Sequence, residues 1–255
     1  MNSVSLALAL LARDLRERYL STFAGFAWVI LTPVVLLSVY AFVFVQLLGA
    51  RFGDRVGGDV IAFLALGMWP WYAFSDSLSR GTSALTANAA LIGQIALPRV
   101  WLVLVPALGA ILIHTVSFLI VLVVLAILGK VSIGLGWLCA MAAYLLLVVN
   151  AVALSLLLAP LNVFFRDVAT LLPQILTFWM LLTPIFFDRQ QLRPDLREWL
   201  AINPMAGVIE TIRDGILFNR YQFDVLIVPA VVSVIVLSLA VAITPRFLRR
   251  IEDFL

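Results

Sequence analysis

Long apolar stretches without Asp, Glu, Lys or Arg recur along the whole chain, and short charged segments separate them. A transmembrane helix needs about 20 largely uncharged residues to cross a hydrocarbon layer of about 30 Å. The stretch over residues 60–75 is shorter and reaches that length only if it extends past Asp76 to Ser79. The other stretches reach it without such an extension. None shows the alternation of apolar and polar residues that is typical of a membrane β-strand. The pattern predicts an all-α, polytopic membrane protein with six transmembrane helices, over residues 28–48, 60–79, 101–128, 133–160, 168–187 and 225–245.

The amino-terminal segment has a different pattern. Apolar side chains recur every three or four residues from Leu8 to Tyr19, and charged residues occupy the other faces. This pattern is typical of an amphipathic helix that lies in the membrane interface. We predict such an interfacial helix over residues 1–27. It is expected to be retained, because Arg13 stands where a signal-peptide cleavage site would lie.

Two loops contain helix signals of their own. In the long loop, Pro194 can open one short helix, and Asn203 with Pro204 provides a cap and a first-turn proline for another. We predict two short outer helices within residues 194–218 that dip back toward the membrane. The inner loop is predicted to form a short helix over residues 83–97.

The distribution of positive charge predicts the orientation. An even number of spans places both termini on one side, and Lys and Arg in short loops favour the cytoplasm. The short loops on the side of the termini carry more arginines than the short loops opposite, although the long loop weakens this bias if it is counted. We therefore expect both termini in the cytoplasm.

The composition excludes several classes of protein. Of the 255 residues, 64% are hydrophobic and only 12% are charged, which excludes an ordinary soluble enzyme and a disordered chain. The net charge of +3 comes from scattered arginines that form no continuous basic face, so no nucleic-acid partner is expected. The single cysteine, Cys139, lies in an apolar run, which excludes a disulfide framework and a thiolate metal site.

Few residues within the spans are able to do chemistry. His114 is the one titratable side chain well inside a predicted span, and Asp76 lies at the end of another. His114 is either a proton relay or substrate contact, or a neutral histidine hydrogen-bonded to a neighbouring helix. The second interpretation is favoured because its own helix has no carboxylate. Gly129 and Lys130 lack the upstream glycine loop of a P-loop, so the chain is predicted to have no catalytic residues and no cofactor, and to take its energy from a partner.

Aromatic residues gather in three of the predicted spans. Some of them fit the interfacial belt that is usual in membrane proteins. Rings nearer mid-span would present flat apolar faces that can pack against the C–H faces of a sugar. The candidate pore aromatics are Tyr40, Phe42, Phe44, Phe178 and Trp179.

Several short motifs, taken in order, resemble the membrane subunit of ABC-2 type polysaccharide exporters, the family that exports O-antigen, teichoic acid and capsule glycans. They are RDLRERY at 13–19, YAFVF at 40–44, GMWPW at 67–71, SLSR at 77–80, LNVFFRDV at 161–168, TPIF at 183–186 and NPM at 203–205. They span most of the chain, so the resemblance implies a single transmembrane domain over residues 1–255. Where many relatives carry lysines in the inner loop, this chain has Gly93, Gln94 and Ile95.

The resemblance also implies partners and roles. It implies a homodimer in the bacterial cytoplasmic (inner) membrane, among membrane lipids, with two copies of a cytoplasmic P-loop ATPase that bind ATP and Mg, and a polyprenyl-pyrophosphate-linked glycan as substrate. The entrance for this substrate would comprise Arg13, Arg16, Arg18, Tyr19 and Arg166. ATPase coupling would involve Leu91, Ile92, Gln94 and Ile95. The outer gate would contain Asn203, Pro204, Ile209 and Ile212, and the aromatics above would line the pore.

Two other functions stay open at this point. One is an ABC-2 permease for a drug or a small lipid, against which the aromatics and the arginine-rich helix favour a glycan. The other is a membrane enzyme of glycan assembly, which the lack of a carboxylate cluster in the membrane disfavours.

Overall fold

The computed structural model describes residues 3–19, 27–47, 59–92, 98–131, 133–221 and 223–248. Its α-helices are α1 (Ser3–Tyr19), α2 (Trp28–Ala41), α3 (Val60–Ala87), α4 (Val100–Ile127), α5 (Gly136–Phe164), α6 (Asp167–Leu181), α7 (Pro194–Ala201), α8 (Pro204–Leu217) and α9 (Ile227–Leu248). A π-helix, Phe42–Leu47, continues α2, and short 3-10 turns cover Ala89–Leu91, Arg189–Gln191 and Asp224–Leu226. These ranges contain no β-strand, so the predicted all-α class is confirmed.

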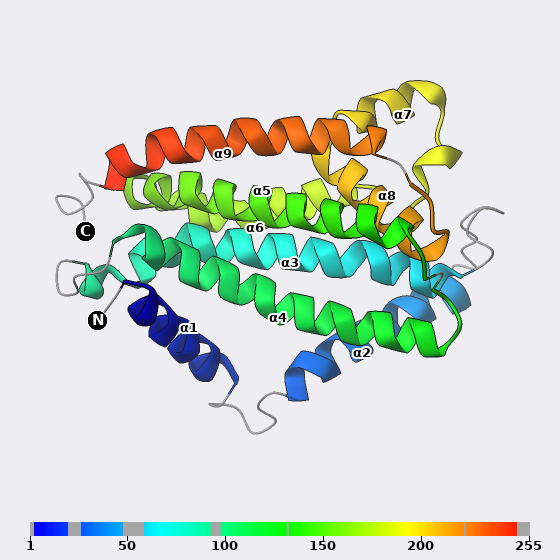
Figure 1. Cartoon of the computed structure of the whole chain (residues 1–255), viewed down its shortest axis with the longest axis horizontal. Coiled ribbons are helices and arrows are strands. Elements are labelled where there is room, and N and C mark those ends of the chain that lie inside the picture. Colours follow the sequence, from blue (N-terminus) through cyan, green and yellow to red (C-terminus); the bar gives the residue numbers. More distant parts are fainter. Residues whose placement is uncertain are drawn as a thin grey trace.

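The long helices α3, α4, α5, α6 and α9 lie side by side along the long axis of the molecule (Figure 1). Helices α1 and α2 cross this bundle obliquely on one side. Helices α7 and α8 gather at one end, which we call the α8 end. The start of α1 and the end of α9 lie at the opposite end, the terminal end.

Helix α3 is the centre of the bundle. It packs against α2, α4, α5, α6 and α8. Asp59 caps its first turn, because the carboxylate accepts a hydrogen bond from the backbone N–H of Ala62 at 3.3 Å. The large side chains of Trp69, Trp71 and Phe74 are at most 2% exposed and fill the space between neighbouring helices.

Among the described residues, three helical segments are long and apolar enough to cross a membrane: Val100–Ile127, Gly136–Phe164 and Asp224–Leu248. Helix α6, Asp167–Leu181, is a shorter apolar helix. The number of six spans stays a prediction, as do the re-entrant paths of α7 and α8.

The structure differs from the predicted boundaries near the inner loop. Residues 83–87 continue α3, and the 3-10 turn Ala89–Leu91 follows, so the predicted start of a separate helix at residue 83 is wrong. The charges do not end the helix, because Arg80 pairs with Asp76 one turn earlier at 2.8 Å. Residues 93–97 lie outside the described residues, as do residues 20–26 of the predicted interfacial segment.

Polar contacts connect the helices within the apolar bundle. The Asn150 amide of α5 donates to the Ser233 hydroxyl of α9 at 2.6 Å, and Thr244 of α9 donates to the Leu156 carbonyl at 2.9 Å. Lipid tails are as apolar as the helix surfaces, so such contacts and close packing hold membrane helices together.

Candidate functional site: a polar cavity within the helix bundle

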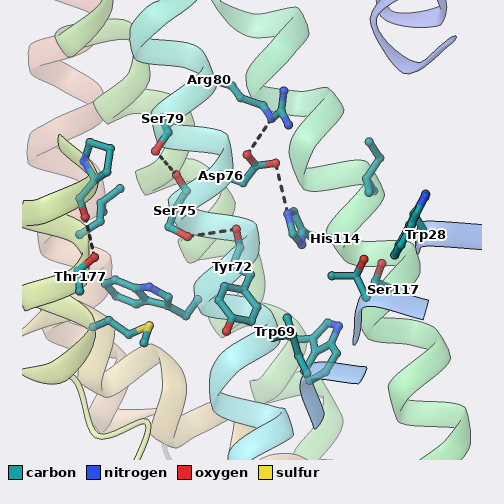
Figure 2. A pocket seen from close by; sticks show the side chains of 17 residues that line it. Trp28, Trp69, Tyr72, Ser75, Asp76, Ser79, Arg80, His114, Ser117 and Thr177 are labelled. Atoms are coloured by element: carbon teal, nitrogen blue, oxygen red, sulfur yellow. Dashed lines mark hydrogen bonds and ion pairs between the residues drawn. The ribbon is translucent and has the colours of Figure 1, made fainter. Parts of the chain in front are cut away.

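A cavity of about 700 Å³ lies between α2, α3, α4 and α6 (Figure 2). Helix α3 provides most of its polar surface, α4 provides His114, and α6 provides Thr177. On the α2 side, Trp28 is 49% exposed. The cavity therefore combines ionisable, hydroxyl and aromatic groups inside an otherwise apolar bundle.

An ionic network forms the polar centre of the cavity. The Asp76 carboxylate lies between two partners: Arg80 Nε contacts Oδ1 at 2.8 Å, and His114 Nε2 contacts Oδ2 at 3.3 Å (Figure 2). The side chains of Arg80, Asp76 and His114 are 41%, 32% and 25% exposed. All three are therefore paired and still accessible from the cavity.

The helical period of α3 explains this polar surface. Tyr72, Ser75 and Ser79 follow one another at intervals of three and four residues, and Asp76 directly follows Ser75, which places all four on one side of the helix. The Ser75 hydroxyl donates to the Tyr72 carbonyl at 3.4 Å, and the Ser79 hydroxyl donates to the Ser75 carbonyl at 2.8 Å. Each serine uses its proton within the helix and keeps an oxygen that can accept a hydrogen bond.

The sequence predicted this network only in part. It favoured a hydrogen bond from His114 to a neighbouring helix, which the structure shows, but it placed Asp76 at the end of a span and did not identify it as the partner. The carboxylate comes from α3, and the contact lies near the middle of α4. The polar spacing from Tyr72 to Arg80 was a signal in the sequence, but its partner helix was not.

The structure disperses the predicted pore aromatics. None of those whose side chains are described lines the cavity. The Tyr40 ring packs against Phe186 at 6.1 Å, whereas Phe178 is 68% exposed and Phe42 is 57% exposed. Trp179 packs edge-on against α3. The side chain of Phe44 lies outside the described residues.

Trp179 joins the predicted pore to the predicted outer gate. Its indole N–H donates to Asn203 Oδ1 at 3.0 Å, and the same oxygen accepts from the Met205 backbone N–H at 3.0 Å. The Asn203 amide donates to the Thr183 hydroxyl at 3.1 Å. Asn203 therefore caps α8 and fixes it to the end of α6, with Pro204 as the first residue of α8. The gate residues Ile209 and Ile212 are completely buried in the core.

The predicted entrance residues lie toward the terminal end. Arg13 borders a small cavity of about 70 Å³ with Asn88 and Leu102. Arg16 and Arg166 are exposed, on α1 and before α6 respectively. The described cavities do not bring these three arginines together. The side chains of Arg18 and Tyr19 lie outside the described residues.

Only part of the predicted coupling segment is described. Ile92 is half-buried and packs against an apolar cluster of the terminal end, which includes Leu85, Leu102 and Leu248. Leu91 ends the 3-10 turn, and its side chain is not described. Gln94 and Ile95 lie outside the described residues. The inward packing of Ile92 leaves less of its surface for a partner than an exposed helix would.

A second polar cavity, of about 240 Å³, lies at the α8 end and was not predicted from the sequence. The completely buried Arg213 donates from Nε to the Phe63 carbonyl at 2.9 Å and from Nη2 to the Ile185 carbonyl at 2.6 Å, and Nη1 reaches the Pro184 carbonyl. Its guanidinium lies 3.6 Å from the centre of the Phe63 ring. Arg213 thus connects α8 with α3 and with the turn after α6.

Burial changes the ionisation of this α8 cluster. It lowers the pKa of Arg213 to about 9, and it raises the pKa of Glu210 to about 7. Arg189 opposes the second shift only in part, although its Nε lies 2.9 Å from the Glu210 carboxylate. Among the described residues, no group of three His, Cys, Asp or Glu side chains is placed to hold a metal ion.

Comparison with known proteins extends over almost the whole chain. The sequence profile described as ABC-2 type transporter matches residues 5–217. An O-antigen export system permease protein RfbA from Myxococcus xanthus is 27% identical, with 98% of this chain and 94% of the relative covered. An RfbA protein from Klebsiella pneumoniae is 25% identical over 92% of this chain and 90% of its own length. The polysialic acid transport protein KpsM from Escherichia coli is 22% identical over 82% and 80%.

Proposed function

Because the chain belongs to the ABC-2 type transporter family, we propose that it is the channel-forming permease subunit of an exporter that moves a lipid-linked polysaccharide, such as an O-antigen-like glycan. The observation that carries this proposal is the similarity to an O-antigen export permease over 98% of the chain. The internal polar cavity supports it, since a path for a hydroxylated polymer needs polar groups within the membrane. The exporter resides in the bacterial cytoplasmic membrane.

The chain is proposed to act as a transport subunit and not as an enzyme. Transport is driven by two copies of a separate cytoplasmic P-loop ATPase, which bind ATP and Mg. Two copies of this chain, each with six spans, enclose the path of a polyprenyl-pyrophosphate-linked glycan. Both termini are cytoplasmic, so the terminal end faces the ATPase and the α8 end faces outward.

The proposed roles of the two ends follow this orientation. Arginines of α1 and Arg166 meet the pyrophosphate at the headgroup level, where positive charge binds anionic groups. At the other end, Asn203 and the buried face of α8 hold the outer gate closed through Trp179 and Thr183. The gate opens when these contacts break.

Gene deletion tests the proposed function. Loss of this chain should remove the glycan from the cell surface and leave lipid-linked glycan accumulating inside, measured by immunoblotting of intact and lysed cells. Loss of the ATPase should give the same result. The purified chain alone should hydrolyse no ATP, and it should copurify with the ATPase. Normal surface glycan together with sensitivity to a lipophilic drug would instead identify a drug or lipid permease.

A further inference from the structure

The ionic network of the polar cavity requires a physical explanation. Asp76 and His114 lie away from the ends of α3 and α4, where charged side chains usually reach water, and Arg80 follows Asp76 one turn later. Ionisable groups within a membrane bundle are costly, and they usually mark a path or a binding site. A purely structural ion pair would be closed off by packing, whereas Asp76 stays 32% exposed and Arg80 41% exposed.

We propose that Asp76, Arg80 and His114 form a binding site for sugar hydroxyl groups on the export path. This inference rests on the proposed function and identifies where the bundle contacts its substrate. The carboxylate of Asp76 accepts hydrogen bonds, and the guanidinium of Arg80 donates them. One sugar ring carries hydroxyls that do both, so neighbouring hydroxyls can contact both residues at once.

The charge of the site favours a hydroxylated ligand over an anion. The positive charge of Arg80 is opposed by Asp76 at 2.8 Å, so the pair carries no net charge. A phosphate would be attracted to Arg80 and repelled by Asp76 at nearly the same distance. A lipid chain would cover the polar groups without replacing their hydrogen bonds, which costs free energy. A neutral glycan avoids both penalties.

The remaining walls of the cavity also suit a sugar. Ser75 and Ser79 provide acceptor oxygens on the same face of α3, one turn apart. Trp28 is 49% exposed on the opposite wall and provides an apolar ring face. Hydrogen-bonding groups on one side and an aromatic face on the other match the two surfaces of a sugar ring. The volume of about 700 Å³ has room for more than one ring.

Cysteine protection tests the site. Cys139 is completely buried, so a Ser79→Cys variant with Cys139→Ala carries one thiol, which faces the cavity. The complex with its ATPase is labelled with a water-soluble maleimide. One sample contains oligosaccharides released from the cell's own surface polysaccharide, and another contains inorganic pyrophosphate. We expect the oligosaccharides to slow labelling at least threefold and pyrophosphate to have no effect. Glu198→Cys, on the exposed surface of α7, should label equally fast in all samples.

A second comparison assigns the protection to the network. Asp76→Asn, and separately His114→Gln, should abolish protection of Ser79→Cys and lower surface glycan. Thr115→Val is the matched control, because Thr115 lies beside His114 in sequence but contacts Tyr144 of α5 at 2.7 Å. It should change neither result. Each variant must still assemble with the ATPase.

Several outcomes would overturn the proposal. Protection by pyrophosphate would identify an anion site. An unlabelled Ser79→Cys would show that the cavity is closed to water, and normal export by both network variants would leave the network a structural role. A different result would contradict the proposed function itself: the wild-type complex would not restore surface glycan to the deletion strain.

Discussion

At the scale of single residues, Arg213 is the side chain whose loss should cost the most stability. Its guanidinium satisfies the carbonyls of Phe63, Pro184 and Ile185 at a buried position. Each buried carbonyl left unpaired costs about 1–3 kcal/mol. Arg213→Met should therefore lower the thermal unfolding midpoint in detergent by roughly 5–10 °C.

The surroundings of Arg213 supply a second variant and a control. An added Cβ at Gly67 would collide with Arg213 Nη2, so Gly67→Ala should also destabilise the α8 end. Arg193→Ala removes an arginine that is 77% exposed and pairs with Asp195 at 3.5 Å. Exposed pairs contribute little, so this variant should melt like the wild type. Equal midpoints for Arg213→Met and Arg193→Ala would contradict the assigned role.

Glu210 should make the stability of the α8 end depend on pH. Its pKa is raised by burial from about 4.5 to about 7, so the folded protein holds the proton more tightly than the unfolded chain. This contribution to stability is complete below about pH 4.5 and is lost as the pH rises through about 7. The thermal unfolding midpoint should decrease as the pH is raised from 5 to 8, and this decrease should be smaller in Glu210→Gln. Glu198→Gln, an exposed change on α7, should retain the wild-type slope.

Single residues also differ in how far the sequence predicts their contacts. Asn203 and Pro204 were assigned to the start of a helix correctly, because a cap and a first-turn proline act within a few residues. The pairing of Asp76 with His114 joins residues on two helices, and no local pattern encodes it. The assignment of Trp179 to the pore, made from its depth in the span, stays a prediction; its hydrogen bond to Asn203 joins two separate segments and could not be predicted from either one.

At the scale of helices, the length of the stretches without charged residues predicted helix positions well, because the thickness of the bilayer sets that length. The predicted span over residues 101–128 corresponds to α4, Val100–Ile127, and the outer helices to α7 and α8. The same criterion placed the end of α3 too early, because the charged residues were taken to end the helix. A charge paired with another charge inside the bundle does not need to leave it, so α3 continues past Arg80 to Ala87.

The position of α1 against α4 gives a prediction at this scale. An added Cβ at Gly109 would lie 3.1 Å from Leu11 Cδ1 and 3.2 Å from Asp14 Oδ2, so the helices meet closely there. Gly109→Ala requires only small shifts of these flexible ends. Gly109→Leu should push α1 away from α4 and reduce export. Leu10 borders the small cavity beneath α1, so a cysteine placed there should react faster with maleimide in Gly109→Leu than in the protein with Gly109. Val123→Phe adds similar bulk at an exposed position of α4 and should change neither measurement.

At the scale of the whole molecule, one chain encloses a polar cavity but leaves much of α2 and α6 uncovered. Val35, Ile175 and Phe178 are all at least 55% exposed. In the proposed homodimer, we expect these helices to border the path between the two copies and the polar cavity to open toward it. The exposed rings would then meet the glycan and not the lipid.

This arrangement gives a sharp test at Phe178. A lipid-facing ring can be replaced by leucine at little cost, since the bilayer does not discriminate ring shape, whereas a sugar-facing ring loses its stacking. A lost contact of about 1 kcal/mol would slow export roughly fivefold in Phe178→Leu. Phe223→Leu is the control, because Phe223 is 63% exposed and precedes the 3-10 turn that leads into α9. Trp179→Leu is less informative, since it also breaks the hydrogen bond to Asn203. Surface glycan is measured in cells with equal amounts of assembled complex. If Phe178→Leu exports as well as Phe223→Leu, Phe178 faces lipid and the cavity residues alone contact the sugar.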